Sequence, residues 1–157
     1  MMNEILVKQV MTEKPPCVVD ESDSIARVIR LLDDHQLYAL PVKNAAGVYT
    51  GVLSKSDIAA RPFLIAMRSG QDPEKIPAAY LMNRSPEYFI DPETPLTDAV
   101  DVMHRHRFQQ LFIQDRDGQI LGIIESLKLL NLTESDPVTP TPAKNSRFQT
   151  RPKKLVG

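Results

Sequence analysis

The chain has 157 residues, of which 42% are hydrophobic and 25% are charged, and its formal net charge is −1. This composition is typical of a globular protein and gives no general attraction to nucleic acid or to anionic membrane. The sequence contains neither the roughly 20-residue apolar run of a membrane span nor the pattern of a secretory signal. A lone cysteine, Cys17, excludes an intrachain disulfide and a cysteine-based metal site. We therefore expect a cytoplasmic protein that binds neither nucleic acid nor membrane.

Residues 4–61 form a first unit in which short apolar strands alternate with helices, as in layered α/β packing. Asp23 is the predicted N-cap of its first helix, and apolar residues follow at i, i+3, i+4 and i+7. These residues are Ile25, Val28, Ile29 and Leu32. In chain order, the predicted elements are a strand at 17–19, this helix, a strand at 39–42, a turn at 45–47, a strand at 48–53 and a helix from Ser54.

A linker at residues 62–77, which carries turn signals, leads into a second unit at residues 78–132. Thr94 is the predicted N-cap of its first helix, with Pro95 at the first helical position. The predicted elements are a strand at 88–90, this helix, a strand at 110–113, a turn at 116–118, a strand at 119–124 and a helix from about Glu125.

The two units are copies of one pattern. Sliding the chain over itself by 71 residues, the separation of Met11 and Met82, aligns about fifty positions without a gap. One unit of about 55 residues is marginally stable alone. We therefore predict an α/β protein with two tandem β-α-β-β-α repeats, packed sheet against sheet with pseudo-twofold symmetry. A cleft at such a seam is a natural ligand site.

Residues 133–157 differ from the rest of the chain. They are rich in Thr and Pro and carry five cations against two anions. Their apolar residues are scattered and form no periodic face that a core would bury. We predict a disordered, weakly basic tail.

The strongest candidate for a functional site lies at the end of the third strand of the first unit. There the sequence reads Gly-Val-Leu-Ser-Lys-Ser-Asp from Gly51 to Asp57. Glycine admits a close backbone approach, and a helix that begins at Ser54 offers unpaired N–H groups to an anion. Asp57 lies on the same helix face, where its carboxylate would accept hydrogen bonds from a ribose diol. Ser-x-x-Asp is also a capping-box arrangement, so the motif alone leaves both interpretations open.

A repeat of this size and order that ends in Gly-h-h-Ser-x-x-Asp, where h is apolar, resembles the cystathionine β-synthase (CBS) domain. Two such repeats resemble the adenosine-binding pair called a Bateman module. The resemblance covers residues 4–132 and assigns 4–61 and 78–132 to the two CBS repeats. It is carried by Val10 to Thr12, Leu37 to Val42, Gly51 to Asp57, Leu81 to Met82, Gln110 to Ile113 and Gly118 to Ile124.

The resemblance implies a non-enzymatic regulatory or sensor module without a covalent cofactor or metal. Such a module binds AMP, ADP, ATP or S-adenosylmethionine in the cleft between its repeats and modulates a partner protein, which the sequence does not identify. The family also implies a homodimer, because twofold closure uses one self-complementary patch twice. An alternative is a ligand-free dimerisation or protein-interaction module whose degenerate nucleotide sites have become packing surface.

The family also implies where the ligand lies. Phosphate and ribose are held by Ser54 and Asp57, which face the other repeat. The remaining residues of this first site are Tyr88, Phe108, Gln109 and Asn83. A second, degenerate site is formed by Thr12, Cys17, Leu37, Tyr38 and Lys128. There Glu125 replaces the hydroxyl and would repel phosphate, and Lys128 replaces the ribose carboxylate, so we expect one competent adenosine site per chain.

The competent site departs from the family pattern as well. Ala39 and Gln110 are neutral at positions where nucleotide-binding relatives often have a basic side chain. Tyr88 replaces a residue that is usually small, so it would either stack on the base or fill the pocket as core.

Other candidates for chemistry are weaker. His104 and His106 are two residues apart on a helix and point to different sides, a poor geometry for a metal. Cys17 lies among apolar neighbours without a paired base. No nucleophile with a base, phosphate-binding loop or paired carboxylate can be assembled, so we predict no catalytic residue.

Overall fold

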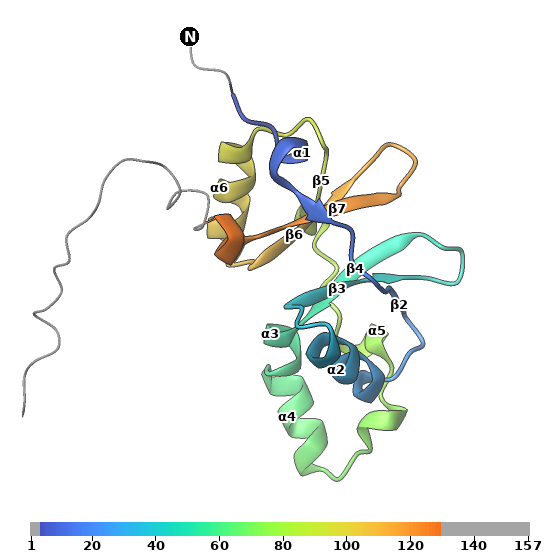
Figure 1. Ribbon diagram of the computed structural model, residues 1–157. Coiled ribbons are helices and arrows are strands. Elements are labelled where there is room, and N and C mark those ends of the chain that lie inside the picture. Colours follow the sequence, from blue (N-terminus) through green and yellow to red (C-terminus); the bar gives the residue numbers. More distant parts are fainter. Residues whose placement is uncertain (1–3, 130–157) are drawn as a thin grey trace, which may run out of the picture.

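Two small β-sheets lie at the centre of the structure, a computed structural model that describes residues 4–129 (Figure 1). The first sheet has the order β2-β3-β4 and consists of β2 (Val19–Asp20), β3 (Ala39–Lys43) and β4 (Tyr49–Ser54). The second has the order β1-β7-β6-β5 and consists of β1 (Thr12–Glu13), β7 (Ile120–Glu125), β6 (Gln110–Gln114) and β5 (Phe89–Ile90). β3 pairs parallel with β2 and antiparallel with β4, and β6 pairs in the same way with β5 and β7.

Helices connect the parallel strands, as such a crossover requires. α2 (Ile25–Asp34) joins β2 to β3, and α6 (Leu96–His106) joins β5 to β6. α3 (Lys55–Ile58) follows β4, and residues 126–129 are helical after β7. This order confirms the predicted α/β fold with two tandem β-α-β-β-α repeats. The predicted tail at residues 133–157 lies outside the described residues.

The segment predicted as a linker contains most of α4 (Arg61–Arg68) and the short 3-10 helix η1 (Pro73–Lys75). Ala66 of α4 is buried, so this helix packs on the first repeat. Across residues 4–129, no helix has the length and apolar character of a membrane span.

The two long helices begin one residue later than predicted. Ser24, rather than Asp23, is the N-cap of α2, and its hydroxyl accepts a hydrogen bond from the Arg27 N–H at 3.1 Å. Asp23 instead forms an ion pair with the Arg27 guanidinium at 3.0 Å. Pro95, rather than Thr94, is at the N-cap of α6. The predicted caps were therefore wrong, because Asp23 and Thr94 each lie one residue before the N-cap.

The first strand of each repeat is shorter than predicted. β2 begins at Val19, and Tyr88 belongs to the 3-10 helix η2 (Pro86–Tyr88) rather than to the strand. The Ser85 hydroxyl accepts a hydrogen bond from the Glu87 N–H at 3.4 Å, and Pro86 fixes the backbone of the turn. This turn places the Tyr88 side chain in the interior.

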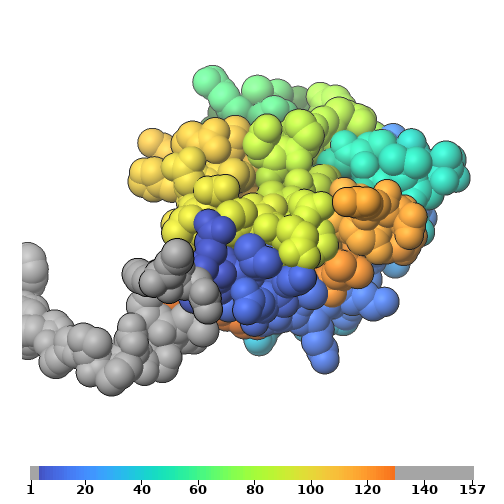
Figure 2. All heavy atoms as spheres, turned by 90° about the horizontal axis from the view of Figure 1, so that it is seen from above, coloured from blue at the N-terminus to red at the C-terminus, as the bar shows by residue number. Residues whose placement is uncertain are grey.

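The N-terminal segment of each repeat packs on the other repeat, an exchange that the sequence pattern did not predict. α1 (Val7–Val10) and β1 join the second repeat, where β1 pairs antiparallel with β7. α5 (Ala78–Leu81) and Asn83 join the first repeat, where Asn83 bridges to Val52 of β4. In Figure 2 the N-terminal segment (blue) lies against residues of the second repeat (yellow and orange).

Matching backbone hydrogen bonds hold the two exchanged segments. The Val7 N–H donates to the Thr94 carbonyl at 2.8 Å, and the Leu96 N–H donates to the Ile5 carbonyl at 2.7 Å. The counterparts, 71 residues away in each case, are Ala78 to Asp23 at 2.7 Å and Ile25 to Ile76 at 2.8 Å. The two repeats therefore share even individual backbone hydrogen bonds at equivalent positions.

Two glycines make this exchange possible. A Cβ atom on Gly51 would lie 2.5 Å from the Asn83 carbonyl oxygen, and one on Gly122 would lie 2.4 Å from the Thr12 carbonyl oxygen. These distances are far below van der Waals contact, so a side chain at either position would displace the exchanged segment. The close backbone approach expected at Gly51 is therefore made by the chain itself.

Gln110 joins the two repeats where their equivalent strands meet. Its side chain is fully buried, its Nε2 donates to the Ala39 carbonyl at 3.0 Å, and its Oε1 accepts from the Ala39 N–H at 3.3 Å. Ala39 and Gln110 are themselves related by the shift of 71 residues. A buried amide with both groups satisfied stabilises the seam, whereas a basic side chain here would leave a buried charge.

Candidate functional site

Ser54 and Asp57 form a complete capping box at the start of α3. The Asp57 N–H donates to Ser54 Oγ at 3.2 Å, and the Ser54 N–H donates to Asp57 Oδ2 at 2.8 Å. The Ser54 hydroxyl donates to the same carboxylate oxygen at 2.8 Å. These contacts realise the capping role that the sequence left open.

One oxygen of the Asp57 carboxylate retains its hydrogen-bonding capacity. All three hydrogen bonds of the capping box involve either the Asp57 N–H or Oδ2, and Oδ1 accepts none from the described residues. Burial raises the pKa of the Asp57 carboxyl, and the hydrogen bonds from Ser54 oppose that increase. Capping and ligand recognition are therefore compatible at this residue, because each uses a different oxygen.

Tyr88 fills the space beside the capping box. Its ring is 3% exposed and stacks on Phe108, with 3.6 Å between ring centroids and 11° between ring planes. Burial raises the pKa of the Tyr88 phenol far above its ordinary value, the nearby Asp57 carboxylate raises it further, and a hydrogen bond with Ser54 opposes both. The phenol is therefore protonated at neutral pH and lies beside Ser54 and Asp57.

Of the other residues expected at this first cleft, one lies beside it and one lies elsewhere. Asn83 lies beside it, and its N–H donates to the Val52 carbonyl at 2.8 Å. Gln109 lies apart, where its Oε1 accepts a hydrogen bond from the Ser126 hydroxyl at 2.9 Å. Tyr38, expected at the second site, instead contacts Ser56 through its hydroxyl and lies near Tyr88.

The second cleft contains an open cavity of about 330 Å³. Of the residues expected there, Thr12, Leu37 and Lys128 line it, whereas Cys17 and Tyr38 do not. The Lys128 ammonium forms an ion pair with Glu125 at 3.2 Å. The remaining lining residues are Glu13, Lys14, Pro15, Pro16, Ile123 and Glu125. Four of these, residues 13–16, belong to or follow β1, so the exchange of the N-terminal segment builds this wall.

The filled and open clefts are equivalent under the shift of 71 residues. Ser54 corresponds to Glu125, Asp57 to Lys128 and Tyr88 to Cys17. Burial raises the pKa of the Cys17 thiol, so this residue acts as a small apolar side chain. The position of the buried Tyr88 ring is therefore held by a much smaller side chain in the first repeat.

Residues 4–129 contain no group of three or more His, Cys, Asp or Glu side chains that could hold a metal ion. Ser54 is 1% exposed, and its hydroxyl proton is directed to Asp57. The first cleft therefore offers hydrogen bonding and aromatic stacking rather than an accessible nucleophile.

Comparison with known proteins agrees with this architecture. Uncharacterized protein MJ1426 of Methanocaldococcus jannaschii is 24% identical, in a match that covers 76% of this chain and 86% of that protein. CBSX2, an Arabidopsis thaliana protein solved in complex with AMP, is 26% identical, with a TM-score of 0.66 over 83% of this chain and 96% of that chain. The CBS domain pair of MJ0100, solved with 5′-methylthioadenosine and S-adenosyl-L-methionine, is 20% identical, with a TM-score of 0.67 over 85% of this chain and 98% of that chain.

Two segments of the chain match the CBS domain family, at residues 7–62 and 78–134. Each segment begins with an exchanged helix, α1 or α5, and continues through the strands of one repeat. Together the segments cover more than half of the chain. The protein therefore belongs to the CBS domain family and contains two CBS domains in tandem.

Proposed function

We propose that this CBS pair is a non-enzymatic regulatory module that binds an adenosine-containing ligand in the cleft beside Ser54 and Asp57 and thereby modulates a partner protein. The observation that carries the proposal is the Asp57 carboxylate, which lies at the seam between the repeats with Oδ1 available to a ribose diol. Support comes from CBSX2, solved with AMP, and from the MJ0100 pair, solved with 5′-methylthioadenosine and S-adenosyl-L-methionine.

The aromatic stack suggests how the adenine enters. Tyr88 lies flat against Phe108, in the arrangement that a purine ring would adopt on an aromatic side chain. In this proposal the adenine replaces the Tyr88 ring on Phe108, and Tyr88 leaves the interior. Binding then shifts the population of a Tyr88-out state, which is the signal that a partner protein reads.

The second cleft is open but has unsuitable charges for a nucleotide. Its Glu125 would repel phosphate, and the ion pair with Lys128 places a cation where the first cleft has the Asp57 carboxylate. We therefore propose one adenosine-type ligand per chain, in the first cleft.

Isothermal titration of ligand-stripped protein with AMP, ADP, ATP, adenosine and S-adenosylmethionine tests the proposal. Asp57→Ala should weaken binding by about 1.5–3 kcal/mol, the range for hydrogen bonds to charged groups. Asp57→Asn keeps an acceptor and most of the capping geometry, so its loss should be intermediate. Thermal unfolding of both variants measures the loss of the cap separately, at about 1 kcal/mol. Wild-type protein that binds none of these compounds below about 1 mM, or Asp57→Ala that binds as tightly as wild type, contradicts the proposal.

A ligand-free dimerisation module is the second candidate function. The observation that favours it is the burial of Tyr88, because an aromatic ring already packed on Phe108 stabilises the empty state. In that case Ser54 and Asp57 act as a helix cap alone, and the titration detects no binding.

A further inference from the structure

Three aromatic rings lie in a row at the first cleft. Phe108 stacks on Tyr88, with 3.6 Å between ring centroids and 11° between ring planes, and on His106, with 5.0 Å and 20°. Two rings this close over one face of Phe108 would overlap, so Tyr88 and His106 lie on opposite faces. Tyr88 is buried and His106 is exposed, so the row runs from the interior to the surface. His106 therefore covers the face of Phe108 that Tyr88 leaves free.

The end of α6 brings His106 and Phe108 together. Side chains two residues apart on a helix do not face each other. Here His106 is the last residue of α6, and Arg107 follows in the left-handed region with a φ of 59°. The Phe108 N–H then donates to the Met103 carbonyl at 3.0 Å, which closes the turn and returns the chain to the helix end. The contact between the two rings is thus built by the helix cap.

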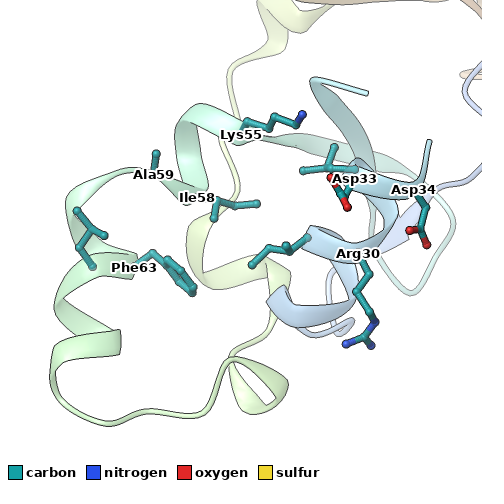
Figure 3. Close-up of a pocket in the computed structure, with 10 residues that line it drawn as sticks. Arg30, Asp33, Asp34, Lys55, Ile58, Ala59 and Phe63 are labelled. Carbon is teal, nitrogen blue, oxygen red and sulfur yellow. The ribbon is translucent and has the colours of Figure 1, made fainter. Parts of the chain in front are cut away.

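The first repeat has the same turn with a different residue after it. α2 ends at Asp34 (Figure 3), His35 is its C-cap, and Gln36 has a positive φ of 53°. Leu37 takes the place of Phe108 and lines the second cleft. Leucine has no ring face, so a stacked histidine is possible only at the cleft with the proposed ligand. His35 is therefore a matched control for His106.

We propose that His106 is a positioning residue of the adenosine site. It holds the Phe108 ring in place as a platform, the ring face on which the adenine stacks after Tyr88 has left the interior. This inference rests on the proposed function and adds to it a residue that does not itself contact the ligand.

The physical reason is the change in packing around Phe108 when the ligand enters. Once Tyr88 leaves, one face of the Phe108 ring loses its contacts, and the ring gains freedom to turn away. His106 keeps the opposite face packed, so the ring remains in the orientation that an adenine needs. A ligand that meets an ordered ring loses less binding free energy to side-chain ordering. Holding Phe108 in place therefore raises the affinity for the adenine.

Calorimetric titration of the full chain with AMP tests this role. His106→Leu removes the ring and should weaken AMP binding about threefold. His106→Phe keeps a flat ring and should retain the wild-type affinity, whereas His106→Lys keeps only a cation at the helix end and should bind like His106→Leu. His35→Leu, in the matched turn, should leave AMP affinity unchanged.

The outcomes separate this inference from the proposed function. If wild type binds AMP and His106→Leu binds it as tightly, the inference is overturned and the proposed function stands. Restoration by His106→Lys rather than by His106→Phe also overturns it, because charge and not the ring would then be what matters. A wild-type chain that binds no adenosine compound overturns both.

NMR spectra of the imidazole groups read the platform without a change at His106. The chain has three histidines, His35, His104 and His106. The ring current of Phe108 should place the His106 C–H signals upfield of those of His35, both without AMP and at saturation. Phe108→Leu, which copies the first repeat, should abolish the upfield shift. Loss of that shift when AMP binds to wild type would show that Phe108 leaves His106, and would overturn the inference.

Discussion

The two clefts between the CBS repeats have the same backbone and opposite properties. At the first, Tyr88 packs on Phe108 and fills the space beside the Asp57 carboxylate. At the second, Cys17 occupies the position of Tyr88, and a cavity of about 330 Å³ remains. Its charged lining residues are Glu13, Lys14, Glu125 and Lys128, and the last two form an ion pair at 3.2 Å. The first cleft therefore holds a buried tyrosine ring beside a carboxylate, whereas the second holds a cavity beside an ion pair.

Under the proposed function, this difference is how a symmetric pair becomes a one-site sensor. The close backbone approaches require glycine at Gly51 and Gly122 in both repeats, whereas the residues after the third strands differ, with Ser54 and Asp57 in one repeat and Glu125 and Lys128 in the other. A ligand that must displace Tyr88 uses part of its binding free energy to change the packing between the two repeats. An open cavity would take up the same ligand with little structural response.

Opening the filled cleft should have the largest effect. Tyr88→Ala removes a buried ring stacked on Phe108 and should lower the free energy of unfolding by about 4 kcal/mol, as measured by urea denaturation. The same variant should bind AMP more tightly than wild type, because no ring has to leave. Tyr88→Phe, the matched control, keeps the stack and should change AMP affinity little. Weaker AMP binding by a folded Tyr88→Ala would show that Tyr88 contacts the base.

Displacing either exchanged segment should lower the stability of the protein by a similar amount. Gly122→Ala and Gly51→Ala each place a Cβ against a backbone carbonyl, and each should lower the free energy of unfolding by about 3 kcal/mol. Gly47→Ala is the control, since it has the positive φ of 83° but open space around it, and should cost about 1 kcal/mol. If all three variants unfold at the same urea concentration, the close approach is not needed.

Transferring chemistry to the open cleft should create a second site. Glu125→Ser combined with Lys128→Asp copies the Ser54–Asp57 pair into the second cleft and should add a second AMP-binding event, with a gain of about 2 kcal/mol over the wild-type cleft. Lys128→Asp alone should add little, because Glu125 still repels phosphate. Calorimetric stoichiometry distinguishes the outcomes, and one AMP per chain in the double variant argues against the role assigned to these positions.

The smallest expected effect is a pH dependence. Burial raises the pKa of Asp57, so its ionisation disfavours the folded state. Protonated Asp57 therefore stabilises the folded state at low pH. This stabilisation is lost as the pH rises from the ordinary aspartate pKa of the unfolded chain through the raised pKa of the folded protein. Wild type should lose stability relative to Asp57→Asn as pH increases through this acidic range, measured by thermal unfolding. A difference that stays constant with pH would show that the pKa of Asp57 is the same in the folded and unfolded chain.

Local sequence patterns predicted the repeats because apolar stripes such as Val28 and Leu32 specify helices wherever they pack. They did not predict the exchange of α1 and α5, since no local periodicity states which repeat a segment joins. Gly51 and Gly122, equivalent under the shift, were the available signal. Tyr88 remained ambiguous because a residue's type does not reveal the volume around it. The sequence analysis assigned Gln109 to the first cleft, but its side chain contacts Ser126 instead. That contact depends on tertiary packing, which the local sequence does not reveal.

The most direct test of the central claim is a crystal structure of the protein with AMP bound. We predict the adenine ring stacked on Phe108, the ribose hydroxyls within hydrogen-bonding distance of Asp57 Oδ1, and the Tyr88 ring displaced from the interior. AMP in the cavity beside Glu125 and Lys128, with Tyr88 still stacked on Phe108, would contradict the account.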